Sequence, residues 1–259
     1  MEDRGMRQVP DRNGGITDPA MAALIGSLSR LEPTAPTWCA GWSAHSIAAH
    51  ITGAAQERAD LIEEHLAGLP GRATRSWEER EAPLRELDGQ VLRDRLLIEA
   101  TRFERNVAAM DPEDALEYTG WTMTAGRMRA HSHSEAALHR WDLVGDDALS
   151  RMFMSEPRLT DHALAAFAAI PALNEAQRWS TAAFSVGSFR LRSAGLDDVL
   201  IRRGSAPLLV PQATAAPADP VVELDVADRL LVLWGRVPPE LRPAGGPVDV
   251  DQLVEHLLP

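Results

Sequence analysis

Three side chains that could bind a metal ion fall on predicted helices, at positions that would face a protein core. His50 lies three residues after Ile47 and four before Ala54, so helical periodicity places its imidazole on an apolar face. Glu135 and His139 are four residues apart, and a helix would stack them on one face about 6 Å apart along its axis. A carboxylate turned toward an apolar core costs several kcal/mol unless it is paired, hydrogen-bonded or bound to a metal. We therefore predict that these three residues hold one divalent metal ion.

Two histidines and one glutamate form the ligand set of catalytic zinc sites, which keep one coordination position open. Closed structural zinc sites usually recruit several cysteines, and this chain has a single one, Cys39. An open position could bind a small-molecule thiol, which loses its proton on coordination and becomes a nucleophile. The predicted chemistry is therefore activation of a thiol by a divalent metal, with zinc as the first choice.

Spacing alone leaves other interpretations of the histidines open. A Glu and a His four residues apart often form an exposed surface pair, and a lone His on an apolar face is often a hydrogen-bonded core residue. His131 lies four residues before Glu135, but a helix would place it about 12 Å from His139, too far to share an ion comfortably. His131 could instead contact a metal ligand. His133 and His45 would lie on other helix faces and be structural or exposed.

Four predicted helices would position these side chains. Asp18, Ser43 and Thr124 are capping residues that each precede a stretch with helical apolar periodicity, and Gly145 follows the last of these stretches. The predicted helices span residues 19–32, 44–66, 84–110 and 125–144. Helices of this length predict a four-helix bundle, a scaffold that builds metal sites from side chains facing its core.

The chain changes character after about residue 150, where predicted strands begin to occur. Apolar or alternating runs predict strands at residues 188–192, 199–201, 208–210 and 221–226. Further helices are expected at 159–170, from Asp225 or Asp228 to Trp234, and at 250–258. The predicted fold class is α+β with two domains. They are a metal-binding helical bundle over 16–150, preceded by a flexible N-terminus over 1–15, and a small α+β domain over 151–259.

Composition and charge exclude several kinds of partner. The 38 acidic residues exceed the 26 basic ones and give a formal net charge of -12, which opposes binding to nucleic acid or to anionic membranes. Residues 1–15 are polar, and no run of about 18 apolar residues occurs that could span a bilayer. The single Cys39 excludes an internal disulfide. We expect a cytoplasmic protein with small-molecule partners, acting as a monomer or small homo-oligomer.

Two segments of the chain resemble a known family. The runs CAGWSAHSIAAH, from Cys39 to His50, and EAALHRWDL, from Glu135 to Leu143, are similar to motifs of the mycothiol-dependent maleylpyruvate isomerase family, within the DinB-like metalloenzymes. Residues 233–236 (LWGR) are similar to the closing helix motif of that family. The resemblance implies a DinB-like helical bundle and a sterol-carrier-like C-terminal domain. It also implies that His50, Glu135 and His139 bind zinc and that mycothiol is the co-substrate.

The resemblance draws attention to two further charged residues. Arg236 resembles a C-terminal arginine that assists catalysis in the family, and its forked donors suit a substrate carboxylate. A surface arginine after a helix end is the alternative. Asp142, three residues after His139, could orient that imidazole or stabilise the helix surface. All 26 basic residues are arginines, which suggests a GC-rich genome and agrees with an actinobacterial source.

The predicted function is that of a metal-dependent enzyme that activates mycothiol for S-transfer or thiol exchange on a small electrophile. Reversible addition of the thiol to a conjugated double bond would instead give a cis-trans isomerase of the maleylpyruvate type. A zinc-dependent sensor or a carrier of small hydrophobic molecules is the non-enzymatic alternative. A saturable, metal-dependent reaction of the thiol would separate the enzyme from the carrier.

Overall fold

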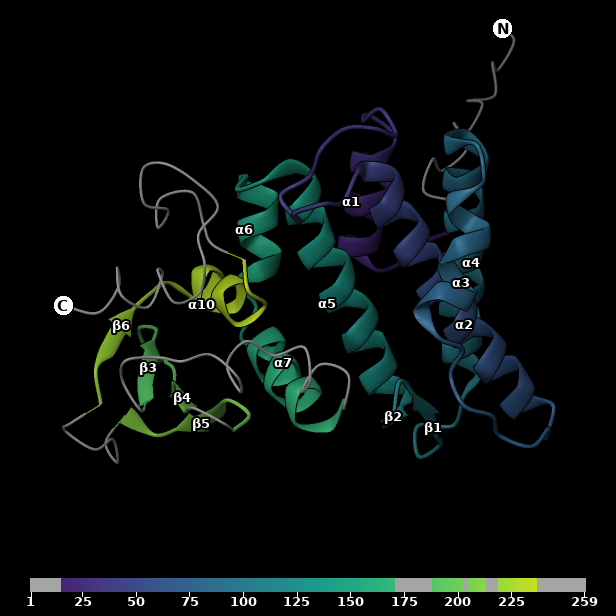
Figure 1. Cartoon of the computed structure of the whole chain (residues 1–259). Helices are drawn as coiled ribbons and strands as arrows, with labels where there is room; N and C mark the ends of the chain where they lie inside the picture. The colour runs from purple at the N-terminus through teal and green to yellow at the C-terminus, as the bar shows by residue number, and fades with distance from the viewer. Residues whose placement is uncertain (1–14, 171–187, 203–204, 213–218, 237–259) are drawn as a thin grey trace, which may run out of the picture.

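Helices form most of the described residues, and two small sheets accompany them in the computed structural model (Figure 1). The structure describes residues 15–170, 188–202, 205–212 and 219–236. The described helices are α1 (Pro19–Leu28), α2 (Ala44–Leu66), α3 (Trp77–Arg85), α4 (Gly89–Ala109), α5 (Ala125–Val144), α6 (Ala148–Met154), α7 (Pro157–Ala169) and α10 (Val226–Leu233). The strands are β1 (Ala115–Tyr118), β2 (Trp121–Thr124), β3 (Ser188–Arg192), β4 (Asp198–Arg202), β5 (Leu208–Val210) and β6 (Val221–Glu223).

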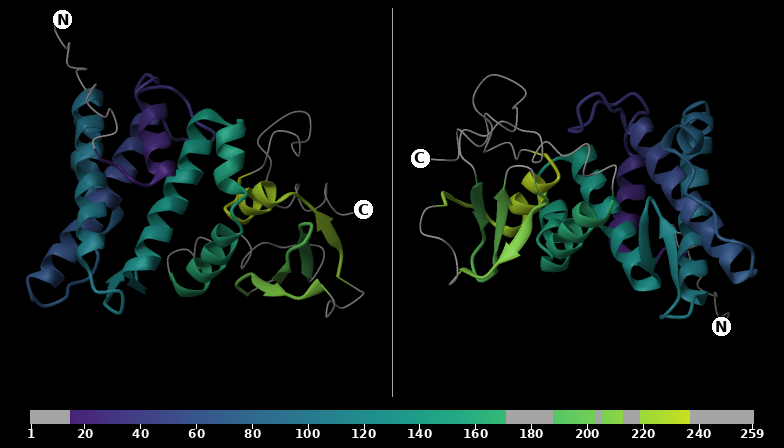
Figure 2. Two further views of the ribbon diagram at one scale, coloured as in Figure 1. Left: turned by 180° about the vertical axis from the view of Figure 1, so that it is seen from behind. Right: turned by 60° about the horizontal axis from the view of Figure 1, so that its bottom comes forward.

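The long helices pack in pairs, α2 along α4 and α1 along α5. Each begins at a residue whose side chain satisfies a free backbone N–H, as Ser43 does for Ser46 and Thr124 does for Arg127. Helix α5 lies in the middle of the molecule, with α1 to α4 on one side and α6, α7 and α10 on the other (Figures 1 and 2). This central place lets α5 offer side chains to both halves of the chain.

A four-stranded sheet with the order β5-β4-β3-β6 follows the helices. Neighbours are antiparallel except β3 and β6, which pair in parallel. Helix α10 continues from β6 and packs on α6 and α7. One apolar cluster runs from α1 and α2 through α6 and α7 into the sheet, so the two halves share buried contacts. The predicted domain boundary after residue 150 stays a prediction.

The mixture of helices with a small sheet agrees with the predicted α+β class. The helices predicted at 44–66 and 125–144 are confirmed with the same bounds. The start predicted at residue 84 is wrong, because Asp88 caps α4 by accepting a hydrogen bond from Gln90 N and the preceding turns belong to the separate helix α3. The strand predicted over 221–226 ends at Glu223, because Asp225 caps α10.

Two predicted segments lie outside the described residues. They are the N-terminus over 1–15, except for residue 15, and the helix over 250–258. None of the helices in the described ranges is long and apolar enough to cross a membrane.

Candidate metal centre

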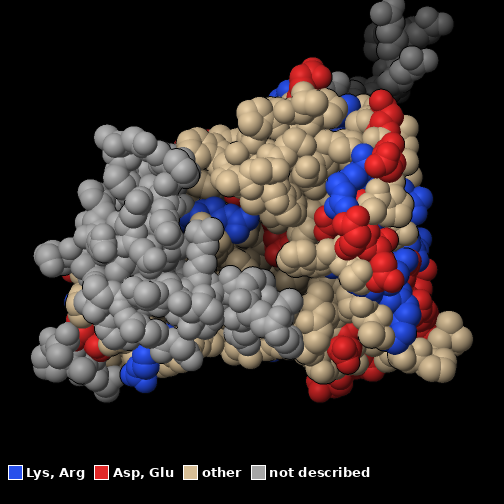
Figure 3. All heavy atoms as spheres, in the orientation of Figure 1, with Lys and Arg blue, Asp and Glu red and all other residues tan. Residues whose placement is uncertain are grey.

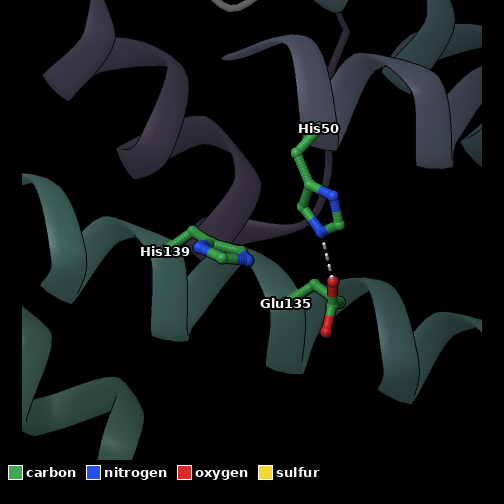
Figure 4. A group of neighbouring side chains, drawn as sticks. All are labelled: His50, Glu135 and His139. Atoms are coloured by element: carbon green, nitrogen blue, oxygen red, sulfur yellow. Dashed lines mark hydrogen bonds and ion pairs between the residues drawn. The ribbon is translucent and has the colours of Figure 1, made fainter. Parts of the chain in front are cut away.

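His50, Glu135 and His139 converge between two helices, as the sequence predicts. His50 extends from α2, and Glu135 and His139 extend from successive turns of α5, with all three side chains pointing toward one another (Figure 4). One ligand atom from each residue lies within 4.8 Å of the other two. His50 Nε2 and Glu135 Oε2 are 3.3 Å apart. Among the described residues, this is the group whose donor atoms are placed to share one ion.

The spacing of these donors fits a small divalent ion. Ligands that lie about 2.0–2.2 Å from a tetrahedral zinc ion are separated from one another by roughly 3.4 Å. The distance between His50 Nε2 and Glu135 Oε2 already has this value. The other ligand atoms lie within 4.8 Å of one another, so they would need to approach by at most about 1.4 Å to complete the set. Two imidazoles and one carboxylate are also a donor set that zinc prefers.

A carboxylate lies behind each histidine, on the nitrogen that faces away from Glu135. Glu81, on α3, lies 2.8 Å from His50 Nδ1, and Asp142 lies 2.9 Å from His139 Nδ1. The second contact, between residues three apart on α5, has the distance of an ion pair, but its geometry is not that of a hydrogen bond. Such outer carboxylates fix the orientation and tautomer of a metal-binding imidazole. They leave Nε2 of each ring for the ion.

The charges around His50 favour its protonated form when no ion is bound. Burial opposes that charge, but the hydrogen bonds and negative charges of Glu135 and Glu81 outweigh it and raise the pKa of His50 to about 9. Burial likewise opposes ionisation of Glu135, yet the hydrogen bond from His50 and the nearby histidines hold the pKa of Glu135 well below its usual value. A proton therefore holds these two ligands together, and an ion entering the site would replace it.

Aromatic rings restrain the histidines. The Trp42 ring stacks on His139, with centroids 5.9 Å apart and planes 12° from parallel, and meets His50 edge-on at 5.3 Å. Trp77, the first residue of α3, meets His50 edge-on at 6.1 Å. These contacts limit the rotation of both imidazoles and make the surroundings of the site apolar.

The three predicted ligands lie in the wall of a cavity of about 750 Å³. Its lining comes from α2, α3, α5, the turn between β1 and β2, and the end of α10, and includes Cys39, Trp234 and Arg236. A space-filling view shows a hollow near the middle of one face, with acidic and basic atoms close to it (Figure 3). The cavity is large enough for a small organic molecule beside the predicted ion.

Arg236 reaches this cavity from the residue after the α10 turn, where Gly235 has a positive φ of 70°. Its guanidinium donates to both oxygens of Asp142, at 3.2 and 2.8 Å, and to the Trp234 carbonyl at 2.8 Å. The pKa of Asp142 is lowered to about 2, because the contacts with His139 and Arg236 outweigh the effect of burial. Arg236 is thus joined to His139 through Asp142, so the surface alternative considered from sequence does not hold.

The other histidines of the described chain do not belong to the group of three predicted ligands. His131 lines the same cavity and contacts His162 at 3.1 Å, with burial lowering the pKa of His131 to about 3 and that of His162 to about 4. His133 contacts Asp18 at 3.0 Å, and His45 contacts the Arg85 carbonyl at 3.0 Å. These contacts tie helices together and agree with the structural interpretation of His133 and His45.

Sequence reasoning missed several residues of the cavity. Glu81, Arg80 and Trp77 belong to α3, which was not predicted, and Tyr118 belongs to the unpredicted strand β1. One signal for α3 was present, since Ser76 and Glu79 have the spacing of a capping box. It would have placed these residues on a helix, but not beside the metal ligands.

Comparison with known proteins extends these observations. Residues 17–144 match the family model described as the mycothiol maleylpyruvate isomerase N-terminal domain. A crystal structure of the mycothiol-dependent maleylpyruvate isomerase is similar to this chain with a TM-score of 0.59 and 16% identity, covering 88% of this chain and 89% of the other. A structure of a histidine-to-alanine mutant of that enzyme gives a TM-score of 0.60 and 16% identity, with coverage of 86% and 88%. No curated protein sequence matches at a significant level.

Proposed function

The chain belongs to the mycothiol-dependent maleylpyruvate isomerase family through residues 17–144, and on this premise we propose that it is a metal-dependent enzyme that activates mycothiol. The thiol then attacks a small electrophile held in the same cavity, by S-transfer or thiol exchange. The observation that supports this most directly is the convergence of His50, Glu135 and His139, each histidine backed by a carboxylate, on the wall of a cavity.

Each residue has a defined task in this proposal. His50, Glu135 and His139 would hold the ion, and zinc bound there would supply a Lewis acid that lowers the pKa of a coordinating thiol. Glu81 and Asp142 lie beside Nδ1 of the two imidazoles and would leave Nε2 of each ring for an ion. The rings of Trp42 and Trp77 contact the histidines and restrain the orientation of both imidazoles.

Isomerisation is the second candidate function, because the matching family model is that of an isomerase. A relative in fold acts as a maleylpyruvate isomerase, and reversible addition of the same thiol to a double bond would give that outcome. The two outcomes share the binding of the thiol and differ in the fate of the adduct. Product analysis distinguishes them, because S-transfer consumes the thiol and isomerisation regenerates it.

The experiment is a calorimetric titration of the zinc-loaded protein with reduced mycothiol and with its disulfide. We expect the reduced form to bind more tightly, because the disulfide has no thiol to lose a proton. Glu135→Gln should remove this preference, whereas Glu117→Gln, an exposed carboxylate on β1, should keep it. Equal affinity of the unchanged protein for both forms would refute the proposal.

The finer fold assignments accompany this proposal. We assign residues 16–150 to a DinB-like four-helix bundle and residues 151–259 to a sterol-carrier-like domain. The bundle would hold the thiol site, and the second domain would form the part of the cavity wall that contacts the second substrate. The end of α10, which brings Trp234 and Arg236 to the cavity, supports this division of labour. The role of Arg236 toward a substrate carboxylate stays a prediction, as do the cytoplasmic location and the oligomeric state.

A further inference from the structure

Arg80 is a buried cation without an acidic partner. Its residue surface is 7% exposed, and within the described ranges no carboxylate contacts its guanidinium. Its Nη1 donates to the Tyr118 hydroxyl at 3.1 Å and its Nε donates weakly to the Ser76 carbonyl at 3.4 Å. Burial of a guanidinium without a counter-charge is costly, so an unpaired one in a cavity wall indicates a ligand that supplies the charge.

The position of Arg80 follows from a close approach of two helices. A Cβ atom at Gly53 of α2 would lie 3.3 Å from both the Cβ and the carbonyl oxygen of Arg80, so glycine lets α3 come close to α2. This contact places Arg80 and Tyr118 in the wall of the cavity that contains the predicted metal ligands.

A second unpaired arginine adds positive charge behind the same ring. Arg58 is fully buried, and its guanidinium lies 5.5 Å from the centroid of the Tyr118 ring, with that of Arg80 at 5.9 Å. Its one hydrogen bond within the described chain goes to Ser132 Oγ at 3.5 Å, and its Nε and Nη1 have none. The adjacent Glu57 does not balance this charge, because it accepts hydrogen bonds from Arg72 and Arg75.

Tyr118 completes the set of donors. Its oxygen accepts the hydrogen bond from Arg80, and its own proton has no acceptor among the residues that the structure describes. An ionised carboxylate accepts hydrogen bonds and donates none, so it can satisfy both the guanidinium and the phenol. A neutral carbonyl could accept from them too, but it would leave the positive charge unbalanced.

We propose that Arg80 and Tyr118 form a subsite for a carboxylate of the small substrate, with Arg58 strengthening the positive potential behind it. This inference rests on the proposed function and adds the residues that recognise the electrophile. The subsite favours a substrate with a carboxylate at one end and its reactive carbon toward His50, Glu135 and His139. Arg236 differs from Arg80 because its guanidinium already has a carboxylate partner, Asp142, which accepts from its Nε and Nη2.

The test is equilibrium binding of succinate and of its neutral diamide, succinamide, to the full-length zinc-loaded protein. Neither probe reacts with thiols, and Trp42, Trp77 and Trp234 line the cavity and report binding through their fluorescence. We expect succinate to bind more tightly than the diamide. Arg80→Gln should weaken succinate binding roughly 10- to 100-fold and leave the diamide unchanged, because a hydrogen bond to a charged group is lost.

Two further variants make the result specific. Tyr118→Phe should weaken succinate binding by a smaller factor, and it keeps the buried ring if Arg80→Gln proves unstable. Arg127→Gln is the matched control, because it removes one arginine that is exposed and stacks on Trp121 outside the cavity. Arg127→Gln should bind both probes like the unchanged protein.

Three results would overturn the inference. The first is equal binding of both probes by the unchanged protein. The second is a preference for succinate that survives both Arg80→Gln and Tyr118→Phe. The third is loss of that preference in Glu135→Gln alone, which would mean that the anion binds the metal. The proposed function fails separately, through zinc content and thiol titration, so either idea can be rejected while the other stands.

Discussion

Zinc affinity should depend steeply on pH, because a proton occupies His50 when the ion is absent. The pKa of His50 is raised to about 9 by Glu135 and Glu81 against the opposing effect of burial. At pH 7 the protonated form would outnumber the neutral form about 100 to 1, so zinc binding at pH 7 should be about 100-fold weaker than the plateau above pH 9. This corresponds to about 3 kcal/mol.

The direction of this effect follows from which form binds zinc. Neutral His50 has a lone pair on Nε2 and can coordinate, whereas the protonated ring cannot. Affinity should therefore rise about tenfold per pH unit from pH 7 to about 9 and then level off. Glu135 contributes no proton in this range, because its pKa lies well below its usual value.

The measurement is a competition titration against a chelator of known affinity at pH 7, 8 and 9. Calorimetry in buffers of different ionisation enthalpy should show release of about one proton per zinc at pH 7 to 8. Glu81→Gln removes the partner of His50 Nδ1, so it should flatten the pH dependence, while Glu117→Gln should not. Affinity that is constant between pH 7 and 9, with no proton release, would refute the reasoning and mean that His50 is neutral beside Glu81.

Three more predictions concern the same cavity. Elemental analysis should find about one zinc per chain in the unchanged protein and little in Glu135→Ala; absence of zinc from the unchanged protein, even after its addition, would contradict the site. Arg236→Ala should keep zinc and thiol binding and lose turnover, whereas full activity with an acidic substrate would count against its predicted role. Acid should destabilise the fold through His131 and His162, whose lowered pKa values of about 3 and about 4 keep them neutral while the unfolded chain takes up protons below about pH 6.5. Their contribution is complete above about pH 6.5 and lost as pH falls toward 4. The free energy of unfolding measured with urea should therefore differ by up to about 3 kcal/mol between pH 6.5 and 5. The difference should be smaller in His162→Asn, and an unchanged pH dependence in that variant would argue against the assignment.

The metal ligands could be predicted because each lies on a regular helix whose residue spacing can be followed along the sequence. Three- and four-residue spacing fixes which side chains share a face, so His50 and the pair Glu135 and His139 were placed toward a core before their contact was known. Their meeting depends on how α2 and α5 pack, which spacing does not give and the resemblance to a family supplied. That they bind a metal stays a prediction.

The start of α4 was wrong because periodicity continues across a real break. Leu84 and Leu87 fit the apolar pattern of the following helix, yet α3 ends at Arg85 and α4 begins at Gly89 after its cap Asp88. Local capping decides such a boundary, since a free backbone N–H at a helix start needs an acceptor. Asp88 was recognisable in the sequence as a capping residue. In the structure this cap, and not the spacing of the leucines, sets the start of α4.

The hairpin of β1 and β2 was missed because its signal is short. Thr119 and Gly120 both have positive φ, 54° and 81°, which makes the two-residue turn that suits antiparallel strands. Threonine is unusual there, and the Thr119 N–H is held by Thr74 Oγ1 at 2.8 Å, a contact from 45 residues away. A turn that relies on so distant a partner cannot be inferred from neighbouring residues alone.

The arginines show most clearly what a sequence leaves open. All basic residues of this chain are arginines, and nothing local separates Arg80 from Arg236. Their surroundings separate them, because Asp142 is a carboxylate partner of Arg236 while no carboxylate in the described chain meets Arg80. Asp142 accepts from Nε and Nη2 of Arg236, which leaves Nη1 for the Trp234 carbonyl and for the predicted substrate contact, whereas no described carboxylate competes for the guanidinium of Arg80. Two arginines in one cavity are thus suited to different tasks, and the residues that accept their hydrogen bonds decide which.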